Sequence, residues 1–122
     1  TVAMARQVGP SGKVIAVDPD PDRILIAQQN QPNDISNIEW INACFSADII
    51  PLNCAIDVIF SNHVFHWFTD KEAAVIASYQ VLQPGGRCAI QFVYALPECL
   101  QLIRQMVNQK LKKDNGAKFV KY

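Results

Sequence analysis

The sequence predicts an α/β fold with a doubly wound, mostly parallel sheet. Short apolar runs at residues 13–18 and 56–60 are typical of strands that are buried on both faces. Segments of helical character separate the strand-like runs, which favours parallel pairing. Half of the 122 residues are apolar, which is enough for the core of one small domain and excludes intrinsic disorder.

The elements are expected in the order α-β-α-β-β-α-β-α. A helix over residues 1–8 ends at Gly9, and a strand follows over residues 13–18. Asp20 is the expected N-cap of the second helix, with Pro21 at its first position. The remaining elements are a strand at 38–42, a loop at 43–55, a strand at 56–60, a helix at 71–82, a tight turn at 84–86, a strand at 87–93 and a helix at 97–113.

Charge and cysteine content exclude several classes of protein. Eleven basic residues balance eleven acidic ones, so general nucleic-acid binding is not expected. No apolar run approaches the roughly 20 residues that span a bilayer, so no membrane partner is expected. Six basic residues gather in residues 101–122, as a solvated helix face or, alternatively, a site for an anionic partner. The four cysteines lack C-x-x-C spacing, which favours buried free thiols and a cytoplasmic location.

Ligands of open α/β sheets bind outside the carboxyl ends of the strands. Asp18 ends the first predicted strand, and a carboxylate at that place can accept hydrogen bonds from the two vicinal hydroxyls of a ribose. The alternative is that Asp18 caps a helix or lies on the surface without binding a ligand.

Three segments resemble motifs of class I S-adenosylmethionine-dependent methyltransferases. They are residues 12–18, 56–62 and 81–87, in family order and at family spacing, within a resemblance that covers residues 1–95. The run Phe65-His66-Trp67, followed by Asp70, is similar to the trans-aconitate and juvenile hormone acid methyltransferases. The resemblance implies a Rossmann-like fold, S-adenosylmethionine as cofactor and methyl transfer to a small molecule, at a carboxylate oxygen of a small-molecule carboxylic acid.

The resemblance also implies roles for individual residues. Asp18 would bind the ribose and Pro19 the adenine ring, while Cys44 and Phe45 fall in the adenine-binding loop. Many members have an acid where this chain has Cys44, so the hydrogen bond to the adenine amino group is not expected from that position. The methionine end of the cofactor would contact Ser61, Asn62 and His63, and the substrate would contact His66, Trp67 and Tyr94.

His63 and His66 are three residues apart and would share one face of a helical turn. A metal site is not expected, because no further ligand lies nearby. A role toward substrate and a structural His-Trp pair at the edge of the core both remain open. Methyl transfer depends mainly on holding the reactants in line, so the sequence identifies no catalytic residue.

The chain is expected to be one partial domain, with a core over residues 1–95 and a C-terminal helix and basic tail over 96–122. The glycine-rich cofactor loop of the family and its last two strands are not found in the sequence. The 122-residue chain alone is therefore expected to bind S-adenosylhomocysteine weakly and to be inactive. Two alternatives to a methyltransferase remain: a shortened, inactive relative that serves as a binding or interaction domain, and a nicotinamide-dependent oxidoreductase of similar architecture.

Overall fold

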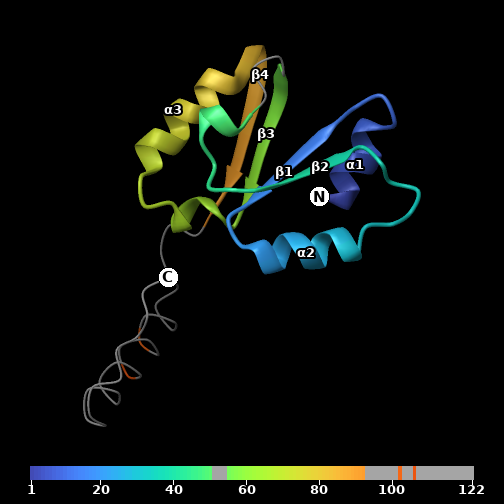
Figure 1. Cartoon of the computed structure of the whole chain (residues 1–122). Helices are drawn as coiled ribbons and strands as arrows, with labels where there is room; N and C mark the ends of the chain where they lie inside the picture. Colours follow the sequence, from blue (N-terminus) through green and yellow to red (C-terminus); the bar gives the residue numbers. More distant parts are fainter. Residues whose placement is uncertain (51–54, 93–101, 103–105, 107–122) are drawn as a thin grey trace. The chain divides into compact units, whose positions relative to one another are not determined.

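The computed structural model describes residues 1–50, 55–92, 102 and 106, and it divides the chain into two compact units (Figure 1). The first unit comprises Thr1–Ala55 and Ala73–Val81. The second comprises Ile56–Glu72 and Leu82–Tyr122. Each unit has its own pair of parallel strands, which confirms an α/β fold with parallel strands.

The first unit is built around β1 and β2. Its elements in chain order are α1 (Val2–Val8), β1 (Val14–Asp18), α2 (Pro21–Gln29), β2 (Ile38–Asn42) and the 3₁₀ helix η1 (Ala47–Ile49), together with most of α3 (Lys71–Val81). The two strands pair from Val14 opposite Ile38 to Asp18 opposite Asn42. Both strands therefore end at the same edge of the sheet.

The start of α2 confirms the predicted cap. The Asp20 side chain accepts hydrogen bonds from the backbone amides of Asp22 and Arg23, and Pro21 occupies the first position of the helix. Proline suits this position because its missing N–H would have no partner inside the helix. This capped turn fixes the direction in which the chain leaves β1.

The core of the first unit joins α1 to the two strands. Ala5, Val14 and Ile35 are buried together, and three partly buried side chains pack against them: Val2, Met4 and Ile38. Asn37 adds a polar link that sequence reasoning missed. Its Nδ2 donates to the carbonyl oxygens of three residues: Ala5 (3.0 Å), Gly9 (2.8 Å) and Gly12 (3.1 Å).

The second unit contains β3 (Ile56–Asn62), the 3₁₀ helix η2 (Phe65–Trp67) and β4 (Leu82–Gln91). The segment 84–86, predicted as a turn before the strand, lies within the bounds of β4. The pairing passes from Ile56 opposite Leu82 to Val58 opposite Arg87, so the glycine segment forms an irregularity in the ladder. A side chain at Gly86 would fall 2.9 Å from the Gln83 carbonyl oxygen, which explains the need for glycine there.

Some predictions about burial were wrong. Cys44 and Cys88 are free but exposed, and Val58 and Phe60 of β3 are 55% and 52% exposed. Alternate residues of a strand share one face, and the face with Val58 and Phe60 is left open in the described part of the chain. Cys54, Cys99, Val93 and most of the predicted helix at 97–113 lie outside the described residues. Within the described residues, no helix has the length and apolar character needed to cross a membrane.

Candidate functional site

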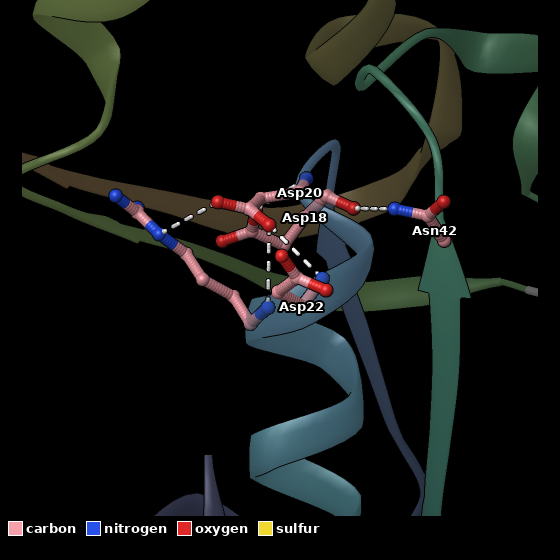
Figure 2. Close-up of polar contacts among 5 residues, drawn as sticks. Asp18, Asp20, Asp22 and Asn42 are labelled. Carbon is pink, nitrogen blue, oxygen red and sulfur yellow. Dashed lines mark hydrogen bonds and ion pairs between the residues drawn. The ribbon is translucent and has the colours of Figure 1, made fainter.

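The carboxyl ends of β1 and β2 place Asp18 beside Asn42 (Figure 2). Asp18 is partly buried, and its Oδ1 accepts a hydrogen bond from the Asp20 backbone amide at 2.9 Å. The Asp18 carbonyl oxygen accepts from Asn42 Nδ2 at 3.0 Å and from the Ala43 amide at 3.2 Å. Asp18 is therefore held through both its backbone and one carboxylate oxygen.

Three carboxylates gather where β1 passes into α2, and they have different surroundings (Figure 2). Asp20 caps the helix and forms an exposed ion pair with Arg23 Nε at 3.3 Å. Asp22 lies in the first helical turn, where the helix dipole favours a negative charge. Asp18 precedes the helix, and of the described residues only Asp20 donates to its carboxylate. Asp18 thus remains able to accept further hydrogen bonds.

The loop after β2 holds the predicted adenine-contacting residues. Cys44 is exposed and Phe45 is partly buried, while Pro19, on the other strand end, is exposed. The nearest acid further along is Asp48 in η1, and the Ser46 hydroxyl holds the pKa of that carboxyl below its usual value. The Asp48 carboxylate therefore already has a hydrogen-bond partner in its own segment.

In the second unit, the ends of β3 and β4 meet at His63. This residue has a positive φ of 54°, and its amide donates to the Gln91 carbonyl at 2.7 Å. Positive φ is uncommon outside glycine, although histidine is one of the residues that adopt it more often. The conformation turns the chain out of β3 toward η2. Ser61 is partly buried, whereas Asn62 and His63 are exposed.

Aromatic side chains make up η2 and pack against it. Phe65 packs against Phe68 and Phe92, with ring centroids 5.8 Å and 5.4 Å apart. The His66 and Trp67 rings lie 4.9 Å apart, and Trp67 is 62% exposed. Phe92 was not singled out in the sequence, because it lies 27 positions away from Phe65 along the chain. Tyr94, predicted to contact substrate, lies outside the described residues.

Two polar atoms of this unit are buried without a partner in the described chain: Ser61 Oγ and His66 Nδ1. A buried polar atom without a hydrogen bond costs about 1–3 kcal/mol. Such atoms in a native structure call for an explanation, and a bound ligand or water is a common one. Both atoms belong to residues that the sequence assigned to cofactor or substrate.

A family model described as a methyltransferase domain matches residues 1–90. The chain belongs to this methyltransferase family. It is 36% identical over 91 residues to an arsenite methyltransferase of Halobacterium salinarum, covering 73% of this chain and 23% of that protein. It is 30% identical over 92 residues to a ubiquinone/menaquinone biosynthesis C-methyltransferase of an Enterobacter species, covering 74% of this chain and 36% of that protein.

The chain spans about a quarter to a third of the length of these curated relatives. No solved structure matches it. The family implies S-adenosylmethionine as the methyl donor, in agreement with the cofactor predicted from the sequence.

The residues at the end of β1 fit the ribose part of this donor. A ribose presents two vicinal hydroxyl groups, and the Asp18 carboxylate has acceptor capacity beyond the single bond from Asp20. The acid is also at the carboxyl end of its strand, where ligands of such sheets bind. The roles of Asp18 and of the other predicted residues stay predictions. Among the described residues, no group of three or more histidine, cysteine, aspartate or glutamate side chains is placed so that it could hold a metal ion.

Proposed function

We propose that the full-length protein transfers a methyl group from S-adenosylmethionine to a small molecule, at a carboxylate oxygen. In this proposal Asp18 binds the ribose hydroxyls and Pro19 and Phe45 contact the adenine ring. Ser61, Asn62 and His63 bind the methionine part. Membership of the methyltransferase family supports the reaction class.

The unpartnered His66 Nδ1 is the observation that carries the choice of a carboxylate. A protonated Nδ1 donates a hydrogen bond, and an ionised carboxylate is a strong acceptor for it. The Trp67 ring lies tilted beside His66 and is exposed, so its indole N–H is a second available donor. The aromatic rings of Phe65 and Phe92 suit an apolar body attached to the carboxylate.

A carboxylate acceptor needs no catalytic base, because it is ionised at neutral pH. The donor supplies an activated methyl group when bound. Ser61, Asn62 and His63 would hold the methionine part of the donor, and His66 and Trp67 would hold the carboxylate that accepts the methyl group. The protein's contribution is then to hold the two reactants in line and to exclude water.

The products of the full-length protein test this proposal. Methyl-labelled donor is supplied with small aliphatic and aromatic carboxylic acids, with arsenite, and with a hydroquinone. The last two follow the names of the relatives. We expect labelled methyl esters, which mild alkali hydrolyses to volatile methanol. Alkali-stable label on arsenic or on a ring carbon would contradict the carboxylate proposal while preserving the methyltransferase. No transfer to any acceptor despite donor binding would favour the inactive binding domain.

His66→Phe separates a substrate role from simple packing, because it keeps an aromatic ring and removes both nitrogens. A hydrogen bond to a charged group contributes about 1.5–3 kcal/mol, so we expect KM for the acid to rise at least about 10-fold. The affinity for S-adenosylhomocysteine should change little, and the thermal midpoint should not fall, because the change also removes a buried polar atom without a partner. A lowered midpoint with unchanged KM would instead assign His66 to packing.

A further inference from the structure

The Asn42 side chain is hydrogen-bonded to the backbone of Asp18, the residue proposed to bind ribose. Its Nδ2 donates to the Asp18 carbonyl oxygen at 3.0 Å, and the Ala43 amide donates to the same oxygen at 3.2 Å (Figure 2). The side-chain bond joins residues 24 positions apart in the chain. The last register pair of the two strands is also Asp18 with Asn42.

Two other features restrain the end of β1: the Ala43 amide bond to the Asp18 carbonyl, and Pro19, since a residue before proline is confined to extended conformations. The next residue, Pro19, has no backbone N–H and is exposed. On the far side of the peptide, the Asp20 amide holds the Asp18 carboxylate through Oδ1. Different donors therefore hold the two groups of Asp18: the Asp20 amide holds the carboxylate, and Asn42 Nδ2 and the Ala43 amide hold the carbonyl.

We infer that Asn42 is a positioning residue, which orients the Asp18 carboxylate for ribose by holding the Asp18 carbonyl. The inference rests on the proposed role of Asp18. Without Asn42 the Asp18 carbonyl keeps only its bond from the Ala43 amide. The peptide can then rotate over a wider range, and this rotation moves the Asp20 amide that holds the Asp18 carboxylate. Asn42 is exposed, and losing its bond should therefore affect ligand affinity more than stability.

Calorimetric titration of the full-length protein with S-adenosylhomocysteine tests the inference. One hydrogen bond has a net value that corresponds to a change of about 3- to 10-fold in Kd, which is the rise expected for Asn42→Ala. Asn42→Asp has the same shape but cannot donate, and it should weaken binding at least as much. Asn30→Ala is the matched control, because Asn30 Nδ2 makes a similar exposed bond to the Ile26 carbonyl at 2.7 Å. It should leave Kd within about 2-fold, as for independent sites.

A double-mutant cycle distinguishes an indirect role from direct contact. When Asp18→Asn has already removed the charged acceptor, adding Asn42→Ala should change Kd by less than about 2-fold. An undiminished loss in that background would mean that Asn42 contacts the ligand itself, which overturns the inference and leaves the proposed function intact. An equal loss from Asn30→Ala would assign the effect to general destabilisation and also overturn it. A wild-type protein that does not bind the ligand would overturn both.

Discussion

Asp18→Asn is expected to lower the affinity for S-adenosylhomocysteine by about 10- to 100-fold, because a hydrogen bond to a charged group is worth about 1.5–3 kcal/mol. Asparagine keeps an oxygen that can accept the Asp20 amide, now at 2.9 Å from Asp18 Oδ1. The turn into α2 therefore survives, and the loss reports on the ligand. Asp18→Ala removes both functions and should weaken binding further.

Asp20→Asn is the control for the charge of the cluster. Aspartate and asparagine are about equally good helix N-caps, so this change removes a neighbouring carboxylate without losing the cap. We expect Kd to change by less than about 3-fold, since the charge of Asp20 is exposed and already paired with Arg23. If Asp20→Asn weakens binding as much as Asp18→Asn, the ribose assignment is wrong and only the total charge matters.

A modified ligand provides a second test of whether Asp18 binds the ribose hydroxyls. The 2′-deoxy analogue of S-adenosylhomocysteine lacks one of the two hydroxyl donors. The wild-type protein should prefer the ribose form, and Asp18→Asn should lose most of this preference. A preference that persists in Asp18→Asn would place the hydroxyl against another residue.

Asn37→Ala is expected to lower the free energy of unfolding of the first unit by about 2 kcal/mol, at about 1 kcal/mol for each of the two N–H groups of Nδ2, one of which is shared between two carbonyls. The three carbonyl acceptors belong to the end of α1 and the turn before β1: Ala5, Gly9 and Gly12. Ala5 is 1% exposed, so its carbonyl has little access to water as a substitute. Asn37→Asp should be worse than alanine, because it turns a carboxylate toward three carbonyl oxygens.

Urea unfolding measured by Trp40 fluorescence reports on this change. Trp40 lies in β2 of the first unit, and a Trp67→Phe background removes the signal of the second tryptophan. Asn33→Ala is a suitable control, since Asn33 is exposed and makes no hydrogen bond among the described residues. An effect of Asn37→Ala below about 0.5 kcal/mol, the usual range for surface substitutions, would show that water replaces these bonds.

Local signals predicted most of the elements. The cap at Asp20, the proline at position 21 and the period of the apolar residues depend on neighbours within one or two turns, and α2 and β2 appear close to where they were expected. The strand after Ile56 runs on to Asn62, two residues beyond the expected end. Its extension depends on pairing with β4 as far as Gln91, which no local pattern reveals.

The residues of the candidate site also differ in whether a local sequence pattern predicts them. Asp18 was found from the sequence because an acid at the end of an apolar run is a local feature. Asn42 was not, since its contact with Asp18 requires that β1 and β2 pair in one particular register. The exposed state of Cys44 and Cys88 was also missed, because an apolar neighbourhood in sequence does not determine which face of a strand or loop is covered.

The sequence by itself determined the family, the α/β class, the cofactor and the acid at the end of the first strand. These follow from residue types, their order and their spacing. The tertiary structure decided which donors hold Asp18, which carbonyls Asn37 joins, and that His66 Nδ1 lacks a partner in the described chain. These depend on strand register and packing between distant segments, where a shift of one residue would exchange every contact.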